Sequence, residues 1–174
     1  LDGHIDRHTA VCDLPRHPDC GLSIDHHQSN APVEDEDSDV VIIWRETPSA
    51  ARIAYDLLEG EVDLSDLADM LVWVDKLDGG GINHEEFRSD HPVIWLGRVV
   101  DIESGIAYHI LESLQHGVSV DDILSGPAVA PALEHRRARQ AEMDSAIAGS
   151  THVVDRLAIV RLEDRNMRSN GYHV

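Results

Sequence analysis

Hydrophobic residues along the first half of the chain form short apolar runs separated by longer helical patterns. Short β-prone runs are predicted over 9–12 and 21–24, and a continuous apolar run over 40–44 predicts a buried strand. A helical pattern then extends from Pro48 to Gly60, with proline in the tolerated first turn and glycine as the stop. A second helix is predicted from about residue 65, capped by Asp63 or Ser65. This order predicts an α/β fold with a mostly parallel central sheet flanked by helices.

The second half is predicted to be mainly helical. Residues 83–92 are interpreted as a polar connection, and helical apolar spacing resumes from Val93 and continues to Leu114. Ser119 and Asp122 resemble a capping box before a short helix. Residues 128–148 are rich in Ala, Glu, Arg and Gln around a thin apolar stripe, which predicts a solvated helix. From Val153 to Leu162 the chain is β-branched and apolar enough to begin a new sheet.

The richest candidate chemistry lies in Ser23-Ile24-Asp25-His26-His27-Gln28-Ser29-Asn30. Successive side chains on an extended segment point to opposite sides, so the two imidazoles diverge. One histidine can then bind a metal ion while the other reaches a different target. Imidazole together with carboxylate suits Mn, Fe, Co or Zn better than an all-oxygen calcium site. The alternative interpretation is a polar loop without a ligand.

Three further carboxylates are candidates. Asp13 follows the strand predicted over 9–12, and ligand groups collect at the carboxyl ends of strands in open α/β sheets. The loop to the next strand is short for a parallel crossover, so the geometry of these two strands is left open. Asp75 and Asp78 are three residues apart near the end of a predicted helix, so both can project toward a common region. Asp78 is slightly favoured as a ligand, and two ordinary surface carboxylates are the alternative.

Taken in order, these motifs resemble the DHH phosphoesterase superfamily. The resemblance covers roughly the first hundred residues, and the matching segments are VCDLP with Asp13, IDHHQSN of 24–30, PSAARIAYDLLEG of 48–60 and VDKLDGG of 74–80. It implies hydrolysis of phosphate esters or anhydrides with two metal ions, usually Mn²⁺, with Mg²⁺ or Co²⁺ as alternatives.

The resemblance also implies a role for each candidate residue. Asp13 would bridge the metals, His26 would bind one of them, and His27 would face the substrate phosphate. Asp25 would hold the motif in place. Asp75 or Asp78 would supply another carboxylate ligand.

The resemblance has one large gap, which is the superfamily's first metal-binding motif. Only residues 1–6 precede Arg7, and Asp2, His4 and Asp6 match that motif in composition but are not expected to match it in geometry. The chain is therefore interpreted as a fragment, with a DHH-type domain over 1–126, a linker helix over 127–149 and the beginning of a second, smaller α/β domain over 150–174. A degenerate DHH domain with a regulatory or assembly role is the alternative to an enzyme, and an acidic α/β domain with incidental histidines is the least favoured interpretation.

The net charge of the chain limits the kinds of molecule that it is expected to bind. The 174-residue chain carries 33 acidic and 14 basic residues, a formal net charge of −19, and has no basic stripe. Duplex nucleic acid is excluded on this ground. Of the substrate classes that the resemblance implies, the acidity favours a small phosphorylated substrate or a short oligonucleotide over long nucleic acid. Such a substrate would depend on metal ions and a few arginines for its attraction, although the acidity also serves solubility.

The remaining expectations concern the cysteines, membranes and assembly. Cys12 is predicted to be a small hydrophobe in a buried strand, and a zinc site at Cys20 is conceivable but not favoured. No membrane span or signal peptide is found, so a cytoplasmic protein is predicted. A homodimer is left open.

Overall fold

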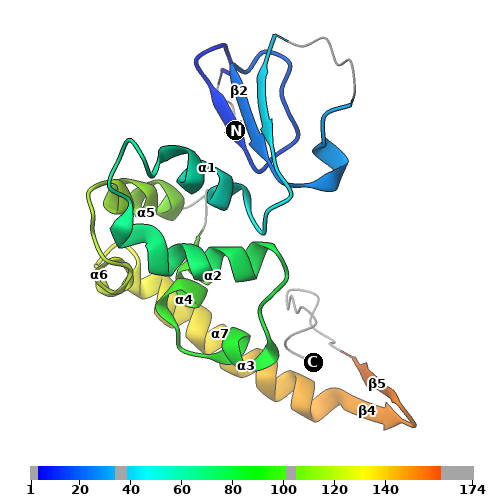
Figure 1. Ribbon diagram of the computed structural model, residues 1–174. Coiled ribbons are helices and arrows are strands. Elements are labelled where there is room, and N and C mark those ends of the chain that lie inside the picture. The colour runs from blue at the N-terminus through cyan, green and yellow to red at the C-terminus, as the bar shows by residue number, and fades with distance from the viewer. Residues whose placement is uncertain (1–3, 34–38, 101–104, 162–174) are drawn as a thin grey trace. The chain divides into compact units, whose positions relative to one another are not determined.

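The computed structural model describes residues 4–33, 39–100 and 105–161 (Figure 1). The chain divides into two compact units, Leu1–Ile82 and Asn83–Val174, which are described separately. The predicted domain limits at residues 126 and 149 stay predictions.

A three-stranded parallel sheet organises the first unit. Its strands are β1 (Ala10–Cys12), β2 (Leu22–Asp25) and β3 (Val41–Trp44), in the order β1-β2-β3. Both pairings are parallel, with Cys12 opposite Ile24 and Ile24 opposite Ile43. The three carboxyl ends therefore meet at one edge of the sheet. The predicted α/β class, with a parallel sheet flanked by helices, is confirmed.

The loop over 13–21 joins two neighbouring parallel strands without a crossover helix. This is feasible because the strands are short: three residues of strand span about 10 Å, which a loop extending about 3.3 Å per residue can retrace. The return is fixed by hydrogen bonds, with the Gly21 amide donating to the Thr9 carbonyl at 3.0 Å. A Cβ on Gly21 would lie 2.0 Å from the Arg7 carbonyl oxygen, so glycine is required for this close approach.

Two helices complete the first unit. Helix α1 (Ala50–Leu58) lies against β2 and begins at Ser49, whose hydroxyl accepts the Arg52 amide hydrogen bond. Helix α2 (Ala68–Asp78) packs on α1 and follows a short 3₁₀ helix, η2 (Ser65–Leu67). A further 3₁₀ turn, η1 (Gln28–Asn30), follows β2.

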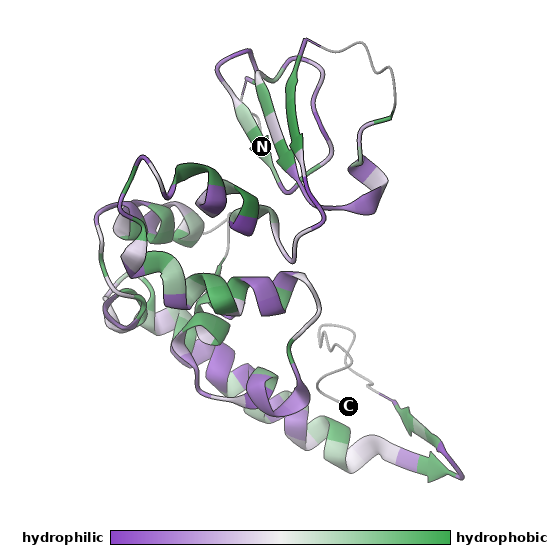
Figure 2. Ribbon diagram, in the orientation of Figure 1, coloured by the Kyte–Doolittle hydropathy of each residue, from purple (hydrophilic) through white to green (hydrophobic). Residues whose placement is uncertain are grey.

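The small core of the sheet corrects one prediction. Val11, Cys20 and Val40 are buried together, and Ile5 and Ile42 pack against them. Cys12 is exposed, because it follows the buried Val11 and neighbouring strand residues point to opposite faces. The buried small hydrophobe is thus Cys20, in the loop, and Cys12 is the exposed thiol. Figure 2 shows the hydrophobic colouring along the strands of this sheet.

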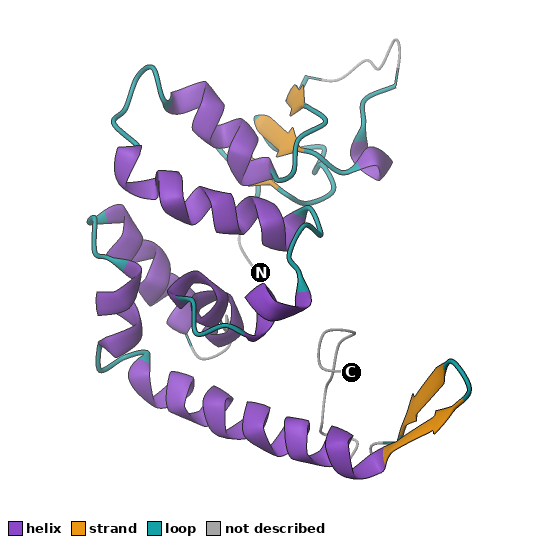
Figure 3. Ribbon diagram, turned by 60° about the horizontal axis from the view of Figure 1, so that its bottom comes forward, coloured by secondary structure: helices purple, strands orange, loops and turns teal. Residues whose placement is uncertain are grey.

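The second unit is a helical assembly followed by a β-hairpin (Figure 3). Its buried cluster combines residues from four helices and a loop: Trp95, Leu96, Val99, Ile110, Ile123, Leu124, Val129 and Leu133. The elements in chain order are α3 (His84–Arg88), α4 (Pro92–Val99), α5 (Ile106–Gln115), α6 (Val120–Ser125), α7 (Ala130–Ser150), β4 (Thr151–Val154) and β5 (Leu157–Val160).

Two local predictions in this unit need correction. Residues 83–92 are not merely a polar connection, because Asn83 and Glu86 form a complete capping box that starts α3. The apolar run from 153 is not one strand: Asp155 adopts a left-handed conformation, φ 56°, and turns the chain into an antiparallel hairpin. The expected cap of α6 is confirmed, since the Ser119 side chain accepts the Asp122 amide hydrogen bond. Within the described ranges, no helix combines the length and apolar character needed to cross a membrane.

Candidate metal centre

Three side chains of the first unit converge at the carboxyl edge of its sheet. Asp13 directly follows β1, His26 directly follows β2, and Asp78 is the last residue of α2. The His26 Nε2 atom lies 3.3 Å from Asp13 Oδ1 and 3.2 Å from Asp78 Oδ2. Segments far apart in the sequence thus bring two carboxylates to one imidazole nitrogen.

The protonation of His26 follows from its other nitrogen. His26 Nδ1 lies 3.0 Å from the Thr47 carbonyl oxygen, which can only accept a hydrogen bond, so Nδ1 carries the hydrogen. In the neutral ring Nε2 then holds a lone pair. This atom is buried and has no hydrogen-bond partner in the described part of the chain. A lone pair this close to two carboxylates is favourable when a cation, either a proton or a metal ion, lies between them. Metal-bound histidines characteristically donate their second N–H to a carbonyl such as that of Thr47.

Asp78 lies in an environment that disfavours its negative charge. Burial raises the pKa of Asp78, and the neighbouring charge of Asp13 raises it further, against the lowering effect of His26 and His27. Asp13 also has φ 62°, in the left-handed region that non-glycine residues rarely adopt. Its amide donates to the Ile24 carbonyl at 3.0 Å, which holds this conformation. Unfavourable backbone and charge are thus concentrated at one point, as is common at functional sites.

Asp25 organises the two histidines rather than offering a free oxygen. Its side chain is only 4% exposed. Its Oδ1 accepts the His26 amide at 2.7 Å, the His27 amide at 3.0 Å and His27 Nδ1–H at 2.8 Å, and its Oδ2 accepts Asn30 Nδ2–H at 2.5 Å. Burial alone would raise the pKa of Asp25, but these hydrogen bonds outweigh it and lower the pKa. Ligand atoms of Asp13, Asp25, His26 and His27 lie within 4.8 Å of one another, yet the Asp25 oxygens are already occupied.

His27 is oriented by its neighbours on both sides. Its Nδ1–H is held by Asp25, and its carbonyl oxygen accepts the Trp44 Nε1–H at 2.9 Å. The bond to Asp25 raises the pKa of His27 against the opposing effect of burial. With Nδ1 engaged and the side chain 46% exposed, Nε2 is the ring atom left to meet a ligand.

Asp75 and Asp78 have different surroundings, although they are three residues apart on α2. Asp75 accepts Ser49 Oγ–H at 2.7 Å and Arg52 Nε–H at 2.9 Å, so both of its oxygens are engaged. This network ties α1 to α2. Asp75 thus braces the helix whose last residue, Asp78, meets His26.

Gly79 allows the end of α2 to approach the turn that holds His26. A Cβ at this position would lie 2.9 Å from the Asp75 carbonyl oxygen and 3.0 Å from the Pro48 carbonyl oxygen. Pro48 follows Thr47, the residue whose carbonyl anchors His26 Nδ1. A side chain at position 79 would therefore push Asp78 away from His26.

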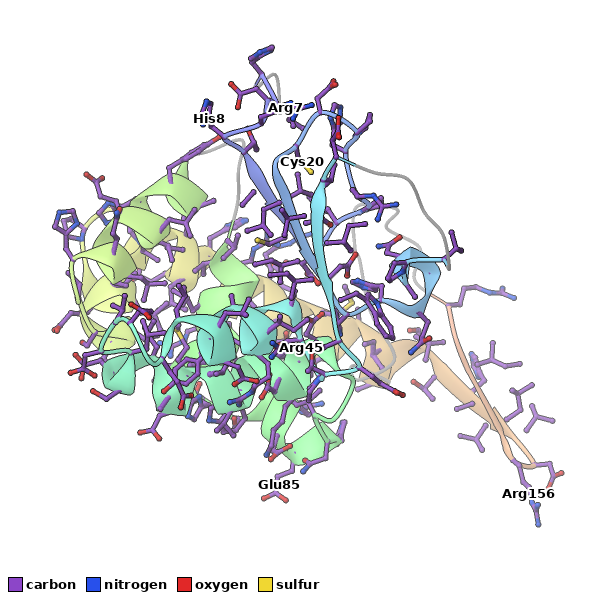
Figure 4. The ribbon with its side chains drawn as sticks, turned by 45° about the horizontal axis from the view of Figure 1, so that its top comes forward. Arg7, His8, Cys20, Arg45, Glu85 and Arg156 are labelled. Carbon is purple, nitrogen blue, oxygen red and sulfur yellow. The ribbon has the colours of Figure 1, made fainter. Side chains whose placement is uncertain are left out.

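The residues that match the superfamily's first metal-binding motif in composition do not lie at this centre where the structure describes them. His4 and Asp6 precede β1, at the amino end of the sheet, where Asp6 Oδ1 accepts the His8 amide at 2.8 Å. Figure 4 shows His8 and Arg7 at this end of the sheet and Arg45 at the opposite end. Asp2 falls outside the described residues.

Several supporting groups of the site are not identifiable as such from the sequence. Asn30 is visible in the sequence motif, but its bond to Asp25 depends on the η1 turn. The Thr47 carbonyl carries no sequence signal at all, because any residue supplies a backbone oxygen. Ser49 is recognisable as a helix cap but not as a partner of Asp75.

Comparisons with known proteins add a likeness of fold. No family model matches the sequence, and no curated protein matches it. Among solved structures, the pGpG-specific phosphodiesterase PggH from Vibrio cholerae is similar, with a TM-score of 0.72 and 21% sequence identity. The match covers 95% of this chain and 56% of that chain, so this chain spans just over half the length of its structural neighbour. At this identity the likeness concerns the fold.

Proposed function

We propose that this chain is a divalent-metal-dependent phosphodiesterase domain of the DHH type, with Asp13, His26 and Asp78 as metal ligands. The observation that carries the proposal is the buried His26 Nε2, which has no hydrogen-bond partner among the residues that the structure describes and lies 3.3 and 3.2 Å from two carboxylate oxygens. One imidazole and two carboxylates suit Mn²⁺ first, with Mg²⁺ or Co²⁺ as alternatives. Three protein ligands also leave positions open for water and substrate, as catalytic sites do.

A bound divalent ion would lower the pKa of a water ligand and withdraw charge from phosphoryl oxygens. The residues of this chain supply the rest. The hydrogen bond to Asp25 raises the pKa of His27 and so favours the ring protonated on both nitrogens. In that form His27 would donate Nε2–H to an oxygen of the substrate phosphate, while Asp25 holds the ring by Nδ1–H. Asp75 keeps α2 in place through Arg52 and Ser49. A two-metal centre, with Asp13 as the shared ligand, is the extension that the superfamily resemblance favours.

The proposed substrate is a small phosphorylated molecule or a short oligonucleotide. The similar fold of a phosphodiesterase specific for the dinucleotide pGpG supports this class. The net charge of −19 also opposes long polyanions more strongly than short ones. A cytoplasmic location, the absence of duplex binding and a homodimer stay predictions.

The test combines Mn²⁺ binding by calorimetry with hydrolysis of bis-p-nitrophenyl phosphate and pGpG. We expect His26→Ala to weaken Mn²⁺ binding by about 100-fold or more, since outer-shell changes alone cost about 10–100-fold in metal affinity. His8→Ala, at the other end of the sheet, is the matched control and should bind Mn²⁺ as the wild type does. Equal Mn²⁺ affinity in both variants would refute the site. Tight Mn²⁺ binding without hydrolysis would favour the regulatory or assembly role instead.

A further inference from the structure

We infer that Arg45 anchors the substrate phosphate at this metal centre, an inference that rests on the metal site proposed above. Arg45 follows β3 directly, at the carboxyl edge that also carries Asp13 and His26. Its amide donates to the Asp25 carbonyl at 3.3 Å, which continues the pairing of β3 with β2. Because Trp44 lies opposite Asp25 in this pairing, the next step along both strands places Arg45 beside His26.

The backbone of Arg45 is also hydrogen-bonded to Thr47, the residue whose carbonyl oxygen holds the His26 ring. Its carbonyl accepts the Thr47 amide at 3.0 Å, and the Thr47 carbonyl in turn engages His26 Nδ1 at 3.0 Å. The segment 45–47 is therefore fixed on both sides by residues of the centre. The long side chain of Arg45 begins from a rigid position, so binding an anion costs little backbone ordering.

The charge of Arg45 is free to meet an anion, unlike that of the other described arginines and the lysine of this unit. Its side chain is exposed and has no ion pair among the described residues. Arg7 pairs with Asp39 at 3.0 Å, Arg52 pairs with Asp75, and Lys76 lies 5.1 Å from the centre of the Trp73 ring. Arg16, the other described cation of this unit, also has an interaction partner.

An exposed arginine at this place offsets the negative charge of the metal centre. The centre gathers the carboxylates of Asp13, Asp25 and Asp78, and the whole chain carries −19. A phosphate that approaches this edge meets repulsion unless a cation receives it. The planar guanidinium offers two parallel N–H donors that match a phosphate in a bidentate manner. Lysine would supply the charge without this fit.

The experiment measures orthophosphate binding to the Mn²⁺-loaded full chain by calorimetry. Hydrogen bonds to charged groups contribute about 1.5–3 kcal/mol, so we expect Arg45→Gln to raise the orthophosphate Kd by about 10-fold or more. The Mn²⁺ Kd should stay unchanged, because Arg45 binds no metal. The orthophosphate Kd of Arg45→Lys should lie between those of the wild type and Arg45→Gln. Arg7→Gln removes an exposed arginine at the opposite end of the sheet and should change neither constant.

Hydrolysis kinetics separate this inference from the proposed function. In Arg45→Gln we expect KM for bis-p-nitrophenyl phosphate to rise more than kcat falls. If hydrolysis and orthophosphate binding are both unchanged in Arg45→Gln, the role of Arg45 as the phosphate anchor is overturned. The proposed phosphodiesterase function is then unaffected. Phosphate binding that depends on Arg45 in a chain without hydrolysis would support the anchor and reject the enzyme. A wild-type chain that binds no orthophosphate would overturn the anchor.

Discussion

The two units of this chain bury different kinds of side chain. In the first, Ser23, Asp25 and Ser49 are buried among a few apolar residues of the sheet and helices. The described part of the second unit has no buried polar side chain, and its core is a continuous cluster of eight apolar residues. Its notable polar group, the Arg98 guanidinium, stacks on the rings of Phe87 and Trp95, and burial lowers the pKa of Arg98.

This difference separates stability from chemistry. An apolar cluster gains free energy from the area it buries, and each member contributes in rough proportion to its size. A buried polar network is favourable only when every donor and acceptor is matched. Removing one member therefore mainly displaces the side chains that it held in position. We therefore expect substitutions of the metal-centre residues of the first unit to act mainly on metal binding and activity, and those in the apolar core of the second unit to act on folding.

The largest effect is expected from Asp13→Ala, which should abolish both Mn²⁺ binding and hydrolysis. Asp13 contacts His26 Nε2 and is the carboxylate nearest to His27 after Asp25. Asp19→Ala, an exposed carboxylate in the same loop, is the control and should retain both properties. Mn²⁺ titration followed by hydrolysis assays checks this, and wild-type affinity in Asp13→Ala would remove Asp13 from the site.

The second effect is a loss of stability in the helical unit. Ile123 is 2% exposed within its core, and Ile→Ala substitutions in cores cost about 2–5 kcal/mol. Leu111, 64% exposed on α5, is the control, since Leu111→Ala should change the free energy of unfolding by about 0.5 kcal/mol or less. Urea unfolding measures both. A lower Mn²⁺ affinity in folded Ile123→Ala would contradict the separation of the two units.

The third effect compares one helix cap in each unit. Ser49 is fully buried and bonds both Asp75 and the Arg52 amide, whereas Ser119 caps α6 in an exposed position. Ser49→Ala should cost about 1–3 kcal/mol, because it also removes the hydrogen bond to the partly buried Asp75 carboxylate. Ser119→Ala should cost about 1 kcal/mol. Equal losses in urea unfolding would show that burial of the cap does not matter.

The smallest effect is expected from Asn30, which lies at the edge of the hydrogen-bond network around Asp25. Asn30→Ala removes one hydrogen bond from Asp25 and should reduce metal-dependent hydrolysis by about tenfold, the lower end for outer-shell partners. Its neighbour Ser29, exposed and 3.5 Å from the Asn30 side-chain oxygen, is the control. Comparing kcat/KM of Asn30→Ala and Ser29→Ala checks this. A drop of equal size in both would assign the effect to the η1 turn rather than to Asp25.

Periodic patterns made much of the fold predictable. The apolar run over 40–44 became β3, and the segment from Pro48 to Gly60 contains α1, because strong periodicity reports which face is buried. The hairpin at Asp155 was not predictable, since its turn depends on a left-handed aspartate within an otherwise β-prone run. The exposure of Cys12 depends on which face of the sheet is covered, and the sequence does not encode this locally.

The candidate site was predictable in composition but not in assignment. Asp13, His26 and Asp78 stand out as residues with metal-binding chemistry, and the structure brings them together. The choice between Asp75 and Asp78 depends on Ser49 and Arg52, which engage Asp75 from another helix. The lone pair on His26 depends on a backbone carbonyl at Thr47. Such contacts arise only in three dimensions.

The helix-free loop over 13–21 has a consequence for the order of folding. Short connections close with little loss of chain entropy, so β1 and β2 can pair early and bring Asp13 beside His26. Asp78, at the end of α2, lies 52 residues beyond His26 in the sequence, so we expect it to join the cluster last. A ligand that binds only the completed cluster stabilises it by mass action. We therefore expect Mn²⁺ to slow hydrogen exchange in α2 more than in β1, so that the metal acts as the final step of folding.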